Sequence, residues 1–233
     1  MMKENILECY IGLDGKKKQR TLVKTITVTI FAGIKFLFDR LMAIFGLIIA
    51  SPLMLIIAIA IKIDSKGPVI FKQERTGKNG ENFYIYKFRT MVANNDVRDF
   101  SKADNHTKIG KILRKTSLDE LPQLFSIAIG KMSFIGPRPW ITDYYDNMNE
   151  KQRHRTDVRP GLTGLAQCMG RNNITIIDKI NYDLEYIRNY SLVQDVKIIF
   201  LTIKCVFTGS GADAGKSTIE NELDVLKRTN KKK

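Results

Sequence analysis

Two adjacent carboxylates, Asp119 and Glu120, open the apolar stretch SLDELPQLFSIAIG in a chain of 233 residues whose formal net charge is +14. Acids at such a position can cap a helix, because they accept hydrogen bonds from free backbone N–H groups and meet the positive end of the helix dipole. Ser117 and Glu120 match the S-x-x-E capping box, although Pro122 favours a helix start one or two residues later. Capping is therefore the structural alternative to a chemical role for the pair.

Isolated cations beside turn residues support a chemical role. They do not form a solvated run, and they come from separate motifs of the chain: Lys87, Arg89, Arg114, Arg138 and Arg159. Arginine grips phosphate oxygens in bidentate fashion, and carboxylates can hold a hard divalent cation between them. The pattern predicts a site for phosphate and metal around Asp119 and Glu120.

The composition favours anionic partners. Lys and Arg number 38 against 24 Asp and Glu, which leaves nucleic acid, phospholipid headgroups and phosphate-bearing small substrates open. Three widely spaced cysteines, Cys9, Cys168 and Cys205, argue against a disulfide framework or a zinc site. The stretch GSGADAGKST, residues 209–218, lacks the glycine spacing of a P-loop, so it indicates a flexible linker.

A long apolar segment is the strongest physical signal in the chain. Leu41 to Ile61 contains 21 residues without a charge, and about 20 are needed to span a bilayer. Ser51-Pro52 lies at its midpoint, where proline kinks a helix, and Lys and Arg flank both ends. A re-entrant hairpin with both ends in the cytoplasm and a kinked single-pass helix both fit this pattern. Residues 25–34, between Lys24 and Lys35, indicate a separate interfacial helix.

The remainder predicts a helix-rich α+β domain. The runs VIFKQ and NFYIYKF alternate around a glycine-containing loop and predict a β-hairpin, and residues 132–135 predict a short strand. The Pro and Gly residues of RPGLTGLAQ, 159–167, argue against a regular element there, and the tail KRTNKKK is typical of a solvated charge run. Helices are expected at 109–114, 119–129, 143–153, 177–189 and 193–207.

The last of these helices carries an apolar stripe at three- and four-residue steps, formed by Val193, Val196, Phe200, Ile203 and Phe207. Such a stripe is more often core packing than membrane contact. We therefore expect this face to be buried within the protein.

The chain resembles the bacterial sugar transferases, the monotopic polyprenyl-phosphate phosphoglycosyl transferases. The resemblance covers roughly residues 35–209 and rests on eight motifs in the family's order. They are FDR, the apolar segment with Ser51-Pro52, GPVIFKQERTG, YKFRTM, SLDELPQLF, GKMSFIGPRP, RPGLTGLAQ and YDLEYIRNYSLVQDVKII.

This resemblance implies transfer of a sugar-1-phosphate from a UDP-sugar onto undecaprenyl phosphate, with release of UMP, as the first membrane step of glycoconjugate synthesis. It implies that Asp119 is the nucleophile, that Glu120 helps to hold Mg2+, and that Ser51-Pro52 bends a re-entrant membrane hairpin. The five cations would contact phosphate, and the RPGxTG stretch implies a nucleotide pocket near Asp157, Thr163 and Gln167. The protein would be monotopic in the bacterial inner membrane, with its catalytic domain facing the cytoplasm.

The expected organisation follows from these motifs. It comprises an N-terminal extension (1–34), a re-entrant helix (35–62), a catalytic domain with a β-hairpin and interfacial amphipathic helices (63–209), and a flexible tail (210–233). This would be the compact, minimal catalytic form, in contact with phospholipids and not with nucleic acid, and a homodimer is compatible with it. A membrane-anchored basic scaffold that binds anionic lipid or nucleic acid without catalysis is the alternative. The sequence leaves the identity of the sugar open.

Overall fold

A computed structural model describes residues 15–92, 106–170, 174–208 and 219–231. In these residues helices predominate and two small two-stranded sheets accompany them, which confirms a helix-rich α+β class. The N-terminal extension before residue 15 and the glycine-containing stretch 209–218 lie outside the described residues. The boundaries of the expected domains stay a prediction.

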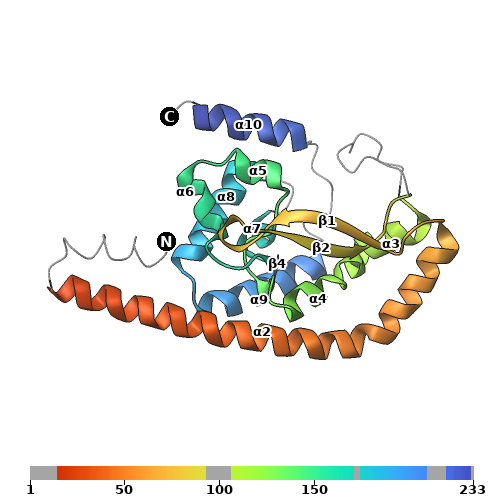
Figure 1. Ribbon diagram of the computed structural model, residues 1–233, viewed down its shortest axis with the longest axis horizontal. Coiled ribbons are helices and arrows are strands. Elements are labelled where there is room, and N and C mark those ends of the chain that lie inside the picture. Colours follow the sequence, from red (N-terminus) through yellow and green to blue (C-terminus); the bar gives the residue numbers. More distant parts are fainter. Residues whose placement is uncertain (1–14, 93–105, 171–173, 209–218, 232–233) are drawn as a thin grey trace.

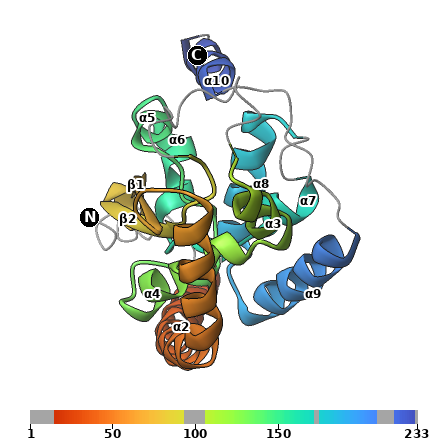
Figure 2. The ribbon, with the colours of Figure 1, turned by 90° about the vertical axis from the view of Figure 1, so that its right-hand side faces the viewer.

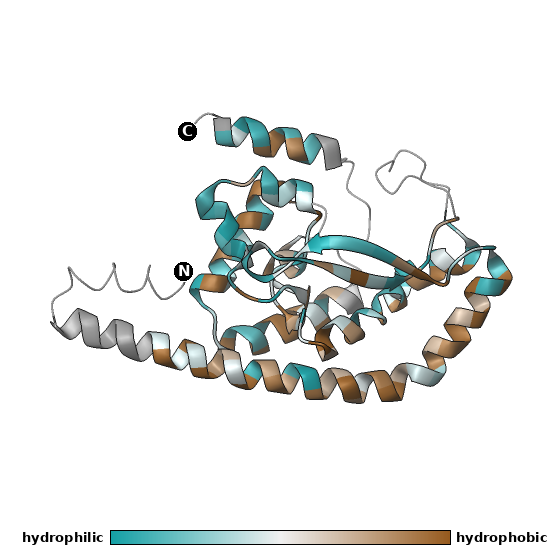
Figure 3. Ribbon diagram, in the orientation of Figure 1, coloured by the Kyte–Doolittle hydropathy of each residue, from teal (hydrophilic) through white to brown (hydrophobic). Residues whose placement is uncertain are grey.

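The longest element is α2 (Gly15–Asp64), a helix of 50 residues that continues through Pro52. It absorbs residues 25–34, which were expected to form a separate helix, and it curves in its second half toward the hairpin (Figure 1). Among the described residues, its part Thr25–Asp64 is the one helix long and apolar enough to cross a membrane by length and composition. Most of its apolar side chains are exposed. Figure 3 shows that hydrophobic residues predominate along much of this helix.

One face of α2 packs on the protein through buried polar contacts. Lys35 Nζ lies 2.7 Å from a carboxylate oxygen of Asp195, and Ser133 Oγ donates to Asp39 at 2.6 Å. Ala43 is fully buried in the core cluster beside them. These contacts fix the first half of α2 against β3 and α9.

The predicted hairpin is confirmed. Strands β1 (Ile70–Thr76) and β2 (Asn82–Phe88) pair antiparallel with Phe71 opposite Lys87, and a short 3-10 turn, η1 (Lys78–Gly80), joins them. Asn79 and Gly80 both adopt positive φ in this turn. Alternation places Phe83 and Ile85 in the core and carries Lys87 onto the same inward face.

The segment around the two acids is less regular than predicted. Helix α3 (Lys108–Thr116) is followed by the 3-10 turn η2 (Leu118–Glu120), then by α4 (Gln123–Ala128) and β3 (Ser133–Ile135). The expected helix at 119–129 therefore starts only after Pro122, whose ring lacks an N–H and favours a helix start. The expected helix at 143–153 is likewise split into α5 (Thr142–Asp146) and α6 (Glu150–Arg153), because Asn149 forms a new capping box with Gln152.

The RPGLTGLAQ stretch does contain regular elements, so that expectation was wrong. A short turn, η3 (His154–Thr156), precedes it, β4 (Gly161–Thr163) pairs parallel with β3, and α7 (Leu165–Met169) follows. Glycine makes this possible, since a Cβ on Gly161 would lie 2.1 Å from the backbone nitrogen of Gly136. The absent side chain lets the two backbones approach.

Helices α8 (Ile176–Arg188) and α9 (Leu192–Thr208) match their predicted ranges closely. The expectation that the α9 stripe is core packing was wrong, because Val193, Val196, Phe200 and Ile203 are all exposed. Figure 2 shows α2, α4 and α9 along one side of the molecule.

The C-terminal segment contains a packed helix, α10 (Ile219–Lys231), where a flexible tail and a solvated charge run were expected. Leu226 is fully buried in a cluster with Tyr144 and Ile180, and Lys179 Nζ lies 2.8 Å from Glu222. The apolar face of this amphipathic helix thus packs against the protein despite the helix's many charges. In both ribbon views α10 lies on the side opposite α2.

Candidate active site

Asp119 and Glu120 lie on the short turn η2, between α3 and α4. Ser117 adopts a left-handed conformation (φ 58, ψ 16) that ends α3, and its side chain makes no capping hydrogen bond. The capping interpretation is therefore wrong, and both carboxylates are available for other contacts.

Glu120 is held by two cations. Its Oε1 accepts hydrogen bonds from Lys87 Nζ at 2.6 Å and from an Arg138 terminal nitrogen at 2.8 Å. Burial alone would raise the pKa of Glu120, but Arg138 and Lys87 hold it well below its ordinary value. The glutamate is therefore a fixed anion that orients Lys87 and Arg138.

Asp119 differs sharply from its neighbour. Within the described part of the chain its carboxylate has no hydrogen bond or ion pair, although it is partly buried. Burial raises the pKa of Asp119, Glu120 raises it further, and Lys87 opposes both effects. Two adjacent acids with oppositely shifted pKa values are typical of an active site that separates their roles.

Arg75 interacts electrostatically with Arg138 and Glu120, and it was not among the site residues predicted from the sequence. It lies on the inward phase of β1, donates a hydrogen bond to Gln73, and leaves its Nε buried without a partner. Burial and nearby Arg138 lower the pKa of Arg75 to about 10. A polar residue in phase with the apolar Phe71 of the strand was the signal that could have identified it.

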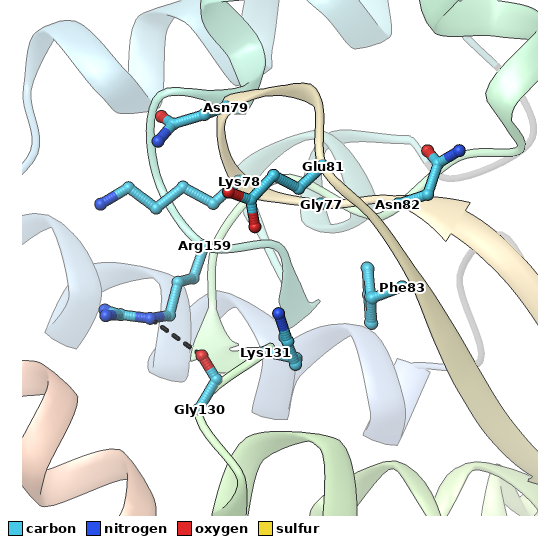
Figure 4. Close-up of a pocket in the computed structure, with 9 residues that line it drawn as sticks. All are labelled: Gly77, Lys78, Asn79, Glu81, Asn82, Phe83, Gly130, Lys131 and Arg159. Carbon is cyan, nitrogen blue, oxygen red and sulfur yellow. Dashed lines mark hydrogen bonds between the residues drawn. The ribbon is translucent and has the colours of Figure 1, made fainter. Parts of the chain in front are cut away.

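The other predicted cations lie elsewhere. Arg89 is buried and donates to the carbonyls of Lys66 and Ser65 at 3.0 and 2.7 Å, so it ties down the chain after α2. Arg114 is exposed, lies 2.8 Å from His106 Nε2, and acts on Asp119 only through its charge. Arg159 lines a separate cavity at the hairpin turn (Figure 4).

The three nucleotide-pocket candidates make internal contacts. Gln167 Nε2 donates to the carbonyl of Leu162 at 2.9 Å, and Thr163 Oγ1 lies 2.8 Å from the hydroxyl of Thr202. Asp157 pairs with His154 at 3.0 Å on the surface. Asp157, Thr163 and Gln167 stay predicted nucleotide contacts.

Asp119 and Glu120 are also the predicted metal ligands. Within the described ranges, no group of three or more His, Cys, Asp and Glu side chains is placed to hold a metal ion. Mg2+ does not require such a cage, because it is commonly bound by one or two carboxylates plus water and substrate phosphates. Asp119, which has no partner in the described part of the chain, and the adjacent Glu120 fit this donor set.

Comparisons with known proteins agree with the motifs. Residues 30–209 match the family model for bacterial sugar transferases. The chain is 45% identical over 187 residues to a UDP-glucose:undecaprenyl-phosphate glucose-1-phosphate transferase of Klebsiella pneumoniae, covering 73% of this chain and 40% of the relative. It is 42% identical over 193 residues to a UDP-N-acetylgalactosamine-undecaprenyl-phosphate N-acetylgalactosaminephosphotransferase of Aeromonas hydrophila, covering 78% and 46%.

A third relative has a similar length to this chain. It is the uncharacterized sugar transferase EpsL of Bacillus subtilis (strain 168), which is 41% identical over 180 residues that cover 76% of this chain and 89% of the relative. The chain spans less than half the length of several other curated relatives that it matches.

Proposed function

The chain belongs to the bacterial sugar transferase family, and from that premise we propose that it transfers a sugar-1-phosphate from a UDP-sugar to undecaprenyl phosphate and releases UMP. The names of its relatives supply both substrate classes. The product would begin a glycoconjugate such as a capsule, an exopolysaccharide, an O-antigen or a protein-linked glycan.

One observation carries the proposal: Asp119 has no partner within the described residues, although it adjoins a glutamate held by two cations. In the proposed reaction a carboxylate oxygen of Asp119 attacks the phosphorus that bears the sugar. The bond from that phosphorus to the UMP oxygen breaks, UMP leaves, and an aspartyl phosphosugar remains. An oxygen of the lipid phosphate then attacks the same phosphorus and releases the Asp119 carboxylate.

Charge is the main obstacle to this chemistry, because nucleophile, donor and acceptor are all anions. Lys87, Arg138 and Arg75 place positive charge around the dyad, and Glu120 fixes the first two in position. A bound Mg2+, held by Asp119 and Glu120, would neutralise charge on the diphosphate. Arg138 is well suited to a phosphate, since its side chain stays 42% exposed while one terminal nitrogen holds Glu120.

We also propose that α2 is the membrane element. Its exposed apolar surface and the curvature of its second half, the half that contains Ser51-Pro52, suit a re-entrant helix whose two ends both lie on the cytoplasmic side. Ser51 Oγ donates to the carbonyl of Ile48 at 2.8 Å, an interaction that commonly bends helices. The catalytic domain would then face the cytoplasm at the inner membrane.

The decisive experiment compares Asp119→Asn with Asp146→Asn, an exposed acid on α5, in detergent-extracted protein with Mg2+ and a polyprenol phosphate. We expect release of UMP from the cognate UDP-sugar to fall by at least ~1,000-fold in Asp119→Asn and to stay unchanged in the control. The thermal midpoint of Asp119→Asn should not fall, because burial opposes the charged aspartate.

Full activity in Asp119→Asn would refute the nucleophile assignment. If the wild type releases no UMP from UDP-glucose, UDP-galactose or the UDP-N-acetylhexosamines yet binds anionic vesicles, the scaffold alternative would replace the transferase. The same panel of donors identifies the sugar.

A further inference from the structure

A second cationic site lies at the turn of the β-hairpin. A cavity of about 190 Å³ opens there between the hairpin turn, the turn that follows α4, and the chain just before β4. Figure 4 shows its lining: Gly77, Lys78, Asn79, Glu81, Asn82, Phe83, Gly130, Lys131 and Arg159. Three of these side chains are cationic and one is anionic, so the lining carries a net charge of +2.

The cations of this turn cavity have few counter-charges. Arg159 Nε donates to the carbonyl of Gly130 at 3.1 Å, and among described residues its two terminal nitrogens have no hydrogen-bond partner. Burial and the proximity of Arg159 lower the pKa of Lys78, although Asp157 and Glu81 oppose this. Lys131 is exposed and makes no ion pair within the described ranges. The cavity therefore offers an anion several hydrogen-bond donors that have no partner among the described residues.

The turn cavity is separate from the site formed by Asp119, Glu120, Lys87 and Arg138. Its lining includes Asn82 and Phe83, the first two residues of β2, whereas Lys87 lies near the other end of that strand. At ~3.3 Å per residue, Phe83 and Lys87 are about 13 Å apart along the strand. Burial lowers the pKa of Arg159, and the ionisable groups that also affect it are Tyr190, Asp39 and Arg40, with neither Asp119 nor Glu120 among them. The turn cavity and the site around Asp119 are therefore distinct.

The turn cavity adjoins the apolar side of α2. The guanidinium carbon of Arg159 lies 4.0 Å from the centre of the Phe36 ring, and Arg40 of α2 donates to the carbonyl of Ala128 at 3.0 Å. Next to these contacts, Phe38 on α2 and Ile129 after α4 are 60% and 49% exposed. Cations at the rim of an exposed apolar surface are typical of the level at which lipid phosphates lie.

We propose that the turn cavity binds the phosphate headgroup of an anionic membrane phospholipid, with Lys78, Lys131 and Arg159 as its donors. The observation that separates a lipid from a soluble phosphate is the position of the cavity against Phe36 and beside the exposed apolar residues. This site goes beyond the proposed transfer reaction and would anchor the hairpin turn to the bilayer.

The test uses the full chain in a non-ionic detergent. Dihexanoyl phosphatidylglycerol is titrated and bound lipid is counted by native mass spectrometry, with dihexanoyl phosphatidylcholine and glycerol 3-phosphate in parallel. Lys78→Gln/Lys131→Gln removes two donors from the cavity while leaving Arg159 in place. Lys62→Gln/Lys197→Gln is the matched control, because these exposed lysines of α2 and α9 lie outside the cavity.

We expect the wild type to bind one phosphatidylglycerol in preference to phosphatidylcholine, and to bind glycerol 3-phosphate far more weakly. The cavity variant should lose at least about tenfold in affinity for phosphatidylglycerol, and the control pair should not. Equal losses in both variants would overturn the proposal in favour of general charge attraction. Equal affinity for phosphatidylcholine, or equal affinity for glycerol 3-phosphate, would overturn it as well.

Discussion

Asp183 and Glu120 are both paired with arginine, but in very different surroundings. Asp183 receives hydrogen bonds from Arg155 at 2.6 and 2.9 Å, and both side chains are only 3% exposed. Glu120 is held by Lys87 and Arg138 at similar distances, yet Glu120 is 19% and Arg138 42% exposed. The Arg155–Asp183 pair is closed to solvent, whereas the Glu120 cluster is open.

The difference separates a structural ion pair from the ion pairs of the proposed active site. Arg155 also donates to the backbone carbonyl of Arg138 at 2.8 Å and stacks 3.8 Å from the Trp140 ring, so its donors are used within the fold. In the Glu120 cluster, by contrast, Asp119 has no partner among the described residues, and the Arg138 guanidinium is partly exposed. The closed pair therefore positions the backbone of Arg138, and of these two groups the open cluster is the one that solvent can reach.

The largest expected effect on stability is at the closed pair. Asp183→Asn leaves Arg155 buried without a counter-charge, and we expect the free energy of unfolding to fall by about 3–5 kcal/mol. Chemical denaturation in detergent measures this change. The double variant Asp183→Asn/Arg155→Met should be more stable than the single variant, because it removes the uncompensated charge. A single variant as stable as the wild type would show that the closed pair does not matter for folding.

The next effect is at the open cluster and falls mainly on activity. Glu120→Gln should lower UMP release by about 10²–10³-fold, because it releases Lys87 and Arg138 and removes one proposed metal ligand. Stability should fall less than in Asp183→Asn, by about 1–3 kcal/mol. If stability falls as far as in Asp183→Asn, the distinction between open and closed sites fails.

The pH dependence of stability also tests the role of Glu120. The pKa of Glu120 in the fold lies below its ordinary value of 4.5, so its stabilising contribution is complete above that value and is lost as the pH falls below it. The difference in unfolding free energy between wild type and Glu120→Gln should therefore be smaller at pH 3.5 than at pH 7. Asp119 has a raised pKa, so Asp119→Asn should show no such loss of stability at pH 7.

Local patterns predicted most elements. Alternation identified β1 and β2, and three- to four-residue periods identified α8 and α9, because a strand or helix period is set by its own residues. The short parallel pairing of β3 with β4 was missed, since it depends on a close approach between Gly136 and Gly161 that only the tertiary fold creates.

The site was predicted in part for a similar reason. Residue types identified Asp119, Glu120, Lys87 and Arg138 as one cluster, and their geometry agrees. Arg89 has the same chemistry as Arg138, but it follows the end of β2 and binds the carbonyls after α2. The sequence shows which side chains can bind an anion, and only the fold shows which of them are already used.

Glu222 on α10 provides an intermediate case. Its carboxylate receives hydrogen bonds from Lys179 at 2.8 Å and from the Tyr144 hydroxyl at 2.7 Å, and it is 17% exposed. Glu222→Gln keeps the shape but removes the charge, so we expect a loss of about 1 kcal/mol in the free energy of unfolding.

Leu226→Ala, which empties a fully buried position of the same helix, should lower the free energy of unfolding more, by about 2–5 kcal/mol. Equal stability of Leu226→Ala and wild type would show that α10 is not packed in solution.

The smallest effect is expected at an exposed pair. His154 and Asp157 lie 3.0 Å apart, but their side chains are 57% and 44% exposed, so water screens them and Asp157→Asn should change stability by less than about 0.5 kcal/mol. Asp157 is also a predicted nucleotide contact, which makes the variant informative beyond stability. A rise in KM for the UDP-sugar with an unchanged kcat would support that contact, because uniform binding would be lost. Unchanged kinetics would leave Asp157 as a member of a surface ion pair. A loss of stability as large as that of Asp183→Asn would show that exposure does not determine how much each carboxylate contributes to stability.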